Sequence, residues 1–238
     1  MDAKRGYVPE DKRNFSPEAM NTMRTASRHI VYLLNEGYDL KQAAVFVGNH
    51  FLLSERQRLA IMRSVASGQQ LADRKRKQRP VSELAGQEAW VDGFNIIITL
   101  EVLLSDSLLF ECMDGTMRDL AALRGTYRLI PETKEAVRLM FGVLQEAGAG
   151  KVNILLDEPV SNSGRLKALI ADVAEEDHCS FELDIQILRD VDRALYRKEF
   201  VITSDSVILD HCVCWVNMTA ECMKRRAGHP LRVWQPLA

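Results

Sequence analysis

Apolar residues recur at helical spacing through the first quarter of the chain. Ser16-Pro17-Glu18 is a typical helix start, because proline suits the first helical position and an acid favours the positive end of the helix dipole. The stripe that follows consists of Met20, Met23, Ile30, Leu33 and Leu34. Shorter helices are predicted from Leu40 to Val47 and from the N-cap Ser54 to about Ala66. We therefore predict a small all-α module over residues 1–67.

From residue 88 onward the pattern changes to short apolar runs that alternate with longer amphipathic stretches. The runs, typical of strands buried on both faces, are 89–91, 152–156, 181–188 and 200–202. The intervening stretches predict helices at 132–147, 165–175 and 206–224. Alternation of strand and helix favours a mostly parallel sheet flanked by helices on both faces. The sequence thus predicts an α/β domain over residues 88–238.

A basic segment, residues 68–87, lies between these two parts, and we interpret it as a linker because of its charge run and Pro80. Residues 1–80 hold 15 Lys and Arg against 8 Asp and Glu, whereas the rest of the chain holds 16 against 25. A basic part fused to an acidic part suggests a polyanion partner for the first and a cation-collecting site in the second. The alternative is that the two oppositely charged surfaces dock on each other.

The composition, 47% hydrophobic and 27% charged, is that of an ordinary globular protein. No apolar run is long enough to cross a bilayer, and residues 1–14 lack the apolar stretch of a secretory signal, so we expect a cytoplasmic protein without a membrane partner. The five cysteines lack framework spacing and are expected to be free, mostly buried thiols. We expect no zinc, because Cys212 and Cys214 would point to different faces of a helix.

Three of the predicted strands finish in an aspartate, namely Asp92, Asp157 and Asp205. Ligands of open α/β sheets bind beyond the carboxyl ends of the strands, so neighbouring strands would bring these carboxylates together. Clustered carboxylates ionise at a cost that a hard cation removes by accepting oxygen ligands. We predict that the three are catalytic ligands of Mg²⁺ or Mn²⁺, with Asp210 or Asp119 as an additional ligand. The alternative for each aspartate is a simple turn or helix cap.

Other residues are candidates for holding a polyanion. Ser161, Ser163 and Gly164 open a predicted helix, whose free N–H groups suit a phosphate oxygen, although an ordinary capped helix start explains them equally well. Ala44 and Gly48 have the spacing of a helix-turn-helix, in which glycine takes the turn; the alternative is a plain helical bundle. The basic residues predicted to contact nucleic acid are Arg56, Arg58, Arg74, Lys75, Arg76 and Lys77.

Two short motifs resemble those of PIN-like nuclease domains. The first is Trp90-Val91-Asp92-Gly93-Phe94-Asn95, an apolar strand that ends in Asp-Gly-aromatic-Asn, and the second is Val201-Ile202-Thr203-Ser204-Asp205. The resemblance implies that Asp92 and Asp205 bind metal, that Asn95 supports the site, and that Asp210 occupies the place of a further acid. For the helical acid that such domains carry between the two motifs, Glu101, Asp119 and Asp157 are alternative candidates.

Over nearly its whole length, the chain resembles an uncharacterised prokaryotic group, the domain of unknown function 434 family with a PIN-like partner domain. The residues that carry this resemblance are 92–119 and 155–164. Our main hypothesis is a metal-dependent nuclease that cleaves RNA in preference to DNA. The alternatives are a non-catalytic nucleic-acid-binding or regulatory protein with a vestigial acidic pocket, and an enzyme acting on a small phosphorylated metabolite. The expected partners are RNA or DNA, with a homodimer as a further candidate.

Overall fold

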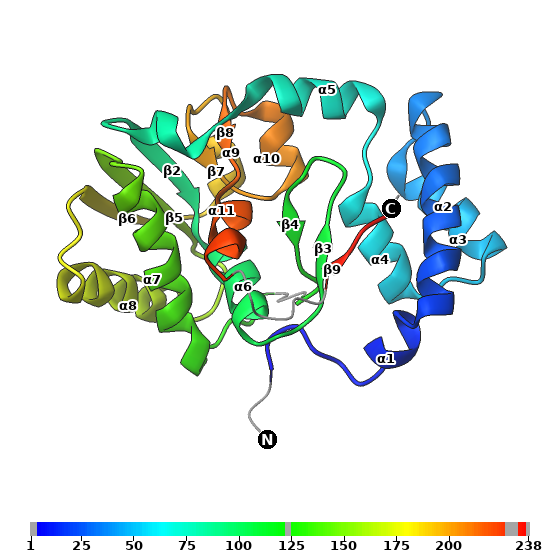
Figure 1. Ribbon diagram of the computed structural model, residues 1–238, viewed down its shortest axis with the longest axis horizontal. Coiled ribbons are helices and arrows are strands. Elements are labelled where there is room, and N and C mark those ends of the chain that lie inside the picture. Colours follow the sequence, from blue (N-terminus) through cyan, green and yellow to red (C-terminus); the bar gives the residue numbers. More distant parts are fainter. Residues whose placement is uncertain (1–3, 122–124, 227–232, 237–238) are drawn as a thin grey trace.

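A computed structural model describes residues 4–121, 125–226 and 233–236. Five helices lie in the N-terminal part and form the right-hand side of Figure 1, with the fifth running across the top toward the rest of the molecule. They are α1 (Asp11–Asn14), α2 (Pro17–Asn35), α3 (Leu40–His50), α4 (Glu55–Ser64) and α5 (Gly68–Lys77). The predicted starts at Ser16 and Ser54 are confirmed, since each hydroxyl accepts a hydrogen bond from the backbone of the first turn.

A six-stranded sheet dominates the C-terminal part, in the order β1-β8-β7-β2-β5-β6, and each of its described ladders is parallel. Its strands are β1 (Gln78–Arg79), β2 (Glu88–Asp92), β5 (Lys151–Asp157), β6 (Glu182–Leu188), β7 (Val201–Ile202) and β8 (Trp215–Val216). The helices are α6 (Gly93–Leu104), α7 (Pro131–Glu146), α8 (Ser163–Glu176), α9 (Val191–Leu195), α10 (Ser206–His211) and α11 (Met218–Arg225). The predicted α/β fold with a mostly parallel, helix-flanked sheet is confirmed.

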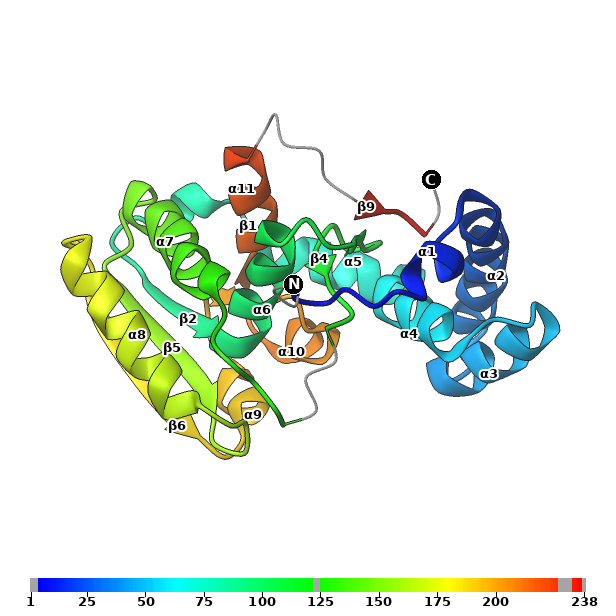
Figure 2. The same cartoon turned by 90° about the horizontal axis from the view of Figure 1, so that it is seen from below.

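Helices cover both faces of this sheet (Figure 2) because successive side chains of each strand point in opposite directions. In β5, Ile154 and Leu156 join the large core beneath α6, α7 and α8. Leu155, between them, belongs to a second cluster with residues of α9 and α10. Burial on both faces explains why β5 is an almost uninterrupted apolar run in the sequence.

A small second sheet connects the two parts of the molecule. It consists of β4 (Met117–Arg118), β3 (Leu109–Glu111) and β9 (Val233–Trp234) in that order. Phe110 and Trp234 are buried in the same apolar cluster as the N-terminal helices, and the Phe110 ring contacts Phe15 of that module at 5.4 Å between centroids. The helical module therefore completes its core with residues of the C-terminal part.

Three features differ from the sequence predictions. The basic segment predicted as a linker is instead α5, β1 and a 3₁₀ helix (Val81–Leu84), and β1 pairs with β8. The predicted helix 206–224 is split into α10, β8 and α11. Gly48 does not take the turn of a helix-turn-helix: it lies within α3, where a Cβ atom would come within 2.8 Å of the Arg58 side chain.

Candidate metal site at the carboxyl ends of the strands

The sheet places the three predicted aspartates at one edge. Strands β7, β2 and β5 are neighbours in the sheet, and Asp92 and Asp157 are the last residues of β2 and β5. Asp205 follows β7 by three residues. Asp92 is in register with Leu155, so Asp157 lies two residues, about 6–7 Å, further along the same direction. Segments that are far apart in the sequence thus bring their carboxylates to the same end of a parallel sheet.

The carboxylates at this edge affect each other's ionisation. Asp92 is 6% exposed. Burial, together with the nearby charges of Asp205, Asp157 and Asp192, raises the pKa of Asp92 to about 8, although a hydrogen bond from Thr203 opposes the shift. Burial and the charges of Asp192 and Asp190 also raise the pKa of Asp157. Such mutual repulsion is the condition that a bound cation relieves.

Asp192, on the short helix α9, is a further acid at this edge that was not predicted from the sequence. Burial and the charges of Asp205 and Asp190 raise the pKa of Asp192, which places it electrostatically within the same group. Asp190 and Asp192 follow the end of β6 at Leu188. The rule that selected the other aspartates, an acid just beyond the carboxyl end of a strand, would have found this one as well.

Asn95 holds the turn that carries Asp205. Its side-chain oxygen accepts hydrogen bonds from the Ser204 backbone N–H (2.8 Å) and the Ser204 hydroxyl (2.9 Å). The Thr203 hydroxyl donates to Asp92 Oδ2 at 2.8 Å. The two motifs singled out in the sequence are therefore joined directly, side chain to side chain, between adjacent strands.

The side chains at this edge are carboxylates, the oxygen donors that hard divalent cations prefer. Asp92 Oδ2 is engaged by Thr203, and Asp205 Oδ1 accepts from the backbone N–H groups of Val207 and Ile208 as the cap of α10. The other oxygen of each carboxylate accepts no hydrogen bond from the described residues. Within the described part of the chain, no three acidic, histidine or cysteine side chains form a complete ligand set as placed, so a cation would have to draw these carboxylates together.

The other acids considered from the sequence are bonded elsewhere. Asp210 forms an ion pair with Arg74, at 2.7 Å from Oδ1 to Nε and 3.0 Å from Oδ2 to Nη2. Asp119 accepts from the Thr99 hydroxyl and the Ala121 N–H, both at 2.8 Å. Glu101 is fully buried and accepts from Arg5 (2.8 Å) and Tyr127 (2.7 Å). Each also pairs with an arginine, Asp210 with Arg74, Glu101 with Arg5 and Asp119 with Arg63 at 3.8 Å, whereas Asp92, Asp157 and Asp192 lie near other carboxylates.

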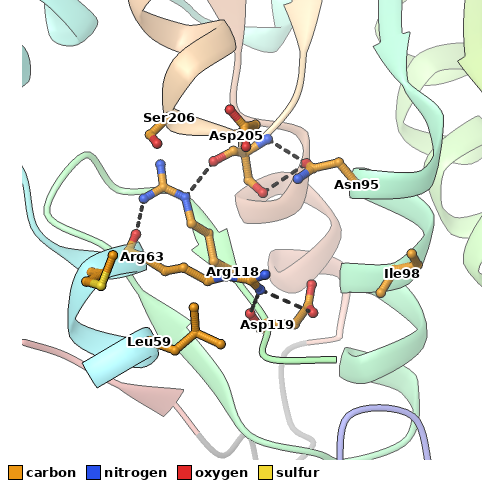
Figure 3. Close-up of a pocket in the computed structure, with 10 residues that line it drawn as sticks. Leu59, Arg63, Asn95, Ile98, Arg118, Asp119, Asp205 and Ser206 are labelled. Carbon is orange, nitrogen blue, oxygen red and sulfur yellow. Dashed lines mark hydrogen bonds and ion pairs between the residues drawn. The ribbon is translucent and has the colours of Figure 1, made fainter. Parts of the chain in front are cut away.

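A pocket of about 300 Å³ opens beside Asp205. Figure 3 shows Leu59 of α4 on one side and the Asn95 and Asp205 side chains on the other. The side chains of Arg63, Arg118 and Asp119 lie between them. Asp119, predicted as a metal ligand, therefore borders this pocket and is held there by hydrogen bonds. The pocket gives a ligand access to the Asp205 side of the acidic edge.

The predicted phosphate-binding residues at the start of α8 are partly used by the protein itself. The Ser161 hydroxyl donates to the carbonyl of Tyr127 (3.0 Å) and accepts from its N–H (2.9 Å). Ser163 is the first residue of α8, and no neighbouring atom comes within 4 Å of a Cβ placed on Gly164. Ser161 thus anchors a loop, while Ser163 and Gly164 remain accessible.

Most of the cations predicted to contact nucleic acid bond to the protein. Arg74 is 2% exposed and pairs with Asp210 and Asp114. Arg56 forms two bonds to Asp11 and donates to the Leu120 carbonyl, and Arg58 donates to the Leu53 carbonyl. Lys77 donates to the carbonyls of Asp210 and Cys212. Of the six, Lys75 and Arg76 are exposed. Arg74 and Lys77 thus contact the acidic part, as the alternative interpretation of the charge asymmetry expects, whereas Arg56 and Arg58 bond mainly within the helical module.

Gly93 is required by the close approach of α6 to β5. A Cβ atom at this position would lie 2.6 Å from Leu156 Cδ2 and 2.9 Å from the Leu155 carbonyl oxygen, which cannot move without disturbing the ladder. We expect Gly93→Ala to lower the free energy of unfolding by about 1–3 kcal/mol through overpacking. Chemical denaturation would measure the loss, and Gly164→Ala is the matched control at an open helical position. Equal stability of the two variants would contradict this packing.

Two family models match the chain in succession. Residues 22–77 match the model described as Protein of unknown function (DUF434), and residues 81–221 match the model described as Domain of unknown function (DUF5616). The first match confirms the resemblance seen in the sequence, although it falls on the helical module and not on the α/β residues that suggested it. The matched families do not include a PIN-like nuclease family.

An uncharacterised protein of Methanocaldococcus jannaschii is 33% identical to the chain over 188 residues, which are 79% of this chain and 89% of that protein. No solved structure matches the chain significantly. Among the described residues, no helix has both the length and the apolar character needed to span a membrane. The two family models and this relative together cover the helical and the α/β parts of the chain, and their descriptions assign no activity to either part.

Proposed function

We propose that this chain, which belongs to the family described as Domain of unknown function (DUF5616), is a divalent-metal-dependent nuclease that hydrolyses phosphodiester bonds, in RNA rather than DNA. The observation that carries the proposal is the convergence of Asp92, Asp157 and Asp205 at the carboxyl ends of three neighbouring strands. Asp192 adds a fourth carboxylate that faces the same group. Asp210 and Glu101, by contrast, are paired with arginines.

The PIN-like interpretation rests on the two motifs and their placement. The aspartates of the two motifs are Asp92, at the end of β2, and Asp205, after β7, and these strands are adjacent in the sheet. Asn95, the third motif residue, bonds to the turn that carries Asp205. Asn95 and Ser204, which are 109 positions apart in the sequence, thus meet as the resemblance implies, which supports a shared metal-binding role.

In this mechanism, Asp92, Asp157, Asp192 and Asp205 would hold Mg²⁺ or Mn²⁺. When bound, the cation supplies positive charge that activates water and offsets the charge of the phosphodiester. Asn95 and Thr203 position the two central carboxylates through the hydrogen bonds described above. The pocket beside Asp205 admits the substrate to this edge of the sheet.

The test is cleavage of labelled single-stranded RNA and DNA of one sequence, with Mg²⁺ or Mn²⁺ and with EDTA. We expect cleavage that EDTA stops, faster on RNA, and a loss of about 100-fold or more in Asp157→Asn and Asp192→Asn because a charged ligand is removed. Asp172→Asn, at an exposed position of α8, is the matched control and should cleave like the unmodified chain.

Full cleavage by Asp157→Asn and Asp192→Asn, or cleavage that survives EDTA, would contradict the proposal. Salt-sensitive binding of the polynucleotide without any metal-dependent turnover would favour the second hypothesis, a non-catalytic nucleic-acid-binding protein. Turnover of small phosphoesters without turnover of polynucleotides would favour the third hypothesis, an enzyme that acts on a small phosphorylated metabolite.

A further inference from the structure

The pocket beside Asp205 lies between the two parts of the chain. One wall comes from α4 of the helical module, through Leu59, Met62 and Arg63, and the other from Asn95 and the turn Ser204–Ser206. We propose that this pocket seats one nucleotide of a single-stranded polynucleotide, next to the phosphodiester at the aspartates. The inference rests on the proposed function and deepens it, because it names the form of the substrate and gives the helical module a role in the site.

The apolar wall suits the face of a base. Leu59, Met62 and Ile98 are partly buried and border the pocket from α4 and α6. An unstacked base has lost contact with its neighbouring bases, and packing against such side chains replaces that contact. This packing does not depend on which base is bound. The wall therefore favours binding that tolerates different sequences.

Arg63 of α4 and Asn95 of α6 offer donors for a phosphate or a ribose. The Arg63 side chain is 36% exposed. Its Nη1 donates to the Asp119 carbonyl and forms an ion pair with Asp119 Oδ1 at 3.8 Å. Arg63 Nε and Nη2 and the Asn95 amide nitrogen donate to no described residue, although the Asn95 oxygen is fully used. An arginine with two such N–H groups is suited to bind phosphate through paired, charge-assisted hydrogen bonds.

Arg118 fixes the two walls relative to each other. It donates through Nε to the Ser204 carbonyl at 2.5 Å and through one terminal nitrogen to the Arg63 carbonyl, and its other terminal nitrogen pairs with Asp114 at 2.6 Å. The side chain is 8% exposed, so its bonds to the protein account for all its nitrogens. One residue thus joins the last turn of α4 to the turn that carries Asp205, and the pocket is formed before any ligand binds.

Size and shape favour a single strand over a duplex. A volume of about 300 Å³ is at the lower end of ligand pockets and suits one nucleotide. In a duplex each base is paired and stacked, so it reaches a pocket only at the cost of unpairing. We therefore expect the chain to bind single strands and to discriminate against a hairpin of the same sequence.

The experiment is equilibrium binding of a fluorescein-labelled single-stranded RNA to the full-length chain, measured by fluorescence anisotropy in EDTA at low ionic strength. Arg63→Ala removes the free donors, and Ser206→Trp fills the pocket without changing charge. We expect each to weaken single-strand binding about tenfold without a change in melting temperature. Arg28→Ala, an exposed cation on α2, is the charge-matched control and should bind like the unmodified chain.

Single-strand binding unchanged in both pocket variants, no binding by the unmodified chain, or equal affinity for the hairpin would each overturn the inference. Because binding is measured in EDTA, the result is separate from turnover. Pocket-dependent binding without metal-dependent cleavage would support the nucleotide pocket and contradict the nuclease. Cleavage whose KM is the same in Arg63→Ala, Ser206→Trp and the unmodified chain would support the nuclease and contradict the pocket.

Discussion

Asp92→Asn is expected to make the metal-free protein more stable at alkaline pH while abolishing metal-dependent hydrolysis. In the folded protein, burial and the charges of Asp205, Asp157 and Asp192 raise the pKa of Asp92 to about 8. The folded state therefore binds a proton that the unfolded state releases near pH 4, and stability falls as pH rises between these two values. One pKa unit corresponds to about 1.4 kcal/mol, so the free energy of unfolding should be several kcal/mol lower at about pH 9 than at about pH 4.

Asparagine removes this loss because it carries no charge at any of these pH values, and its side-chain oxygen can still accept the hydrogen bond from Thr203. Unfolding by denaturant should give nearly equal free energies for the two proteins at about pH 4 and a more stable variant at about pH 9. Mn²⁺ should raise the melting temperature of the unmodified protein and have much less effect on the variant, because a ligand stabilises only the state that binds it.

Asp172→Asn, at an exposed position of α8, is the control for a simple change of net charge. A parallel pH dependence of stability in Asp92→Asn and the unmodified protein would mean that Asp92 is not held in a repulsive environment. The metal-site proposal would then lose its electrostatic basis.

The second large effect is expected at Arg74, where a buried guanidinium joins two carboxylates. It pairs with Asp114 at 2.8 Å and with Asp210 at 2.7 Å, and the Arg74 and Asp114 side chains are 3% and 1% exposed. Burial alone would raise the pKa of Asp114, but the charges of Arg118 and Arg74 and bonds from Thr116 outweigh it, so this pKa lies below its ordinary value. Arg74→Ala should destabilise the protein by about 3–5 kcal/mol, since it leaves the buried Asp114 carboxylate with Arg118 alone and removes the ion pair of Asp210.

Arg76→Ala is a control from the same basic run, because the Arg76 side chain is 76% exposed and its ion pair among the described residues is a local one, with Asp73. It should change the free energy of unfolding by less than about 0.5 kcal/mol, as is usual for surface ion pairs. Denaturant unfolding of both variants would measure the difference. Similar small effects at the two positions would show that Arg74 is a surface cation, as the sequence had suggested.

Asp92 and Arg74 illustrate which features were predictable from the sequence. The strand that ends at Asp92 and the cap at Ser54 depend on neighbouring residues, so local pattern was sufficient for both. The fate of Arg74 depends on Asp210, 136 residues away, and no local pattern contains that pairing. Likewise, the two-residue strand β1 exists because it pairs with β8, and its own residues, Gln78 and Arg79, carry no strand signal.

The residues of the candidate site also differ in how far the sequence predicted them. Aspartates near the ends of strands were predictable because the ends of parallel strands share one edge, and Asp192, four residues beyond the end of β6, follows the same rule. The role of Glu101 was not predictable, because this helical acid is turned toward Arg5 and Tyr127. Which face a helical acid presents depends on tertiary packing, and the sequence alone leaves that open.

The joint between the two matched families has a consequence for how the protein is assembled. The matches end at residue 77 and resume at residue 81, and β1 lies in this interval, paired with β8 at the margin of the sheet. The indole N–H of Trp215 in β8 also donates to the Arg74 carbonyl at 2.8 Å. Cleavage of the chain in this interval would separate β1 from the sheet or from α5, and the buried indole N–H of Trp215 would lose its acceptor. We therefore expect that neither half remains folded as a separate fragment after limited proteolysis. Melting should accordingly be a single cooperative transition of the whole polypeptide.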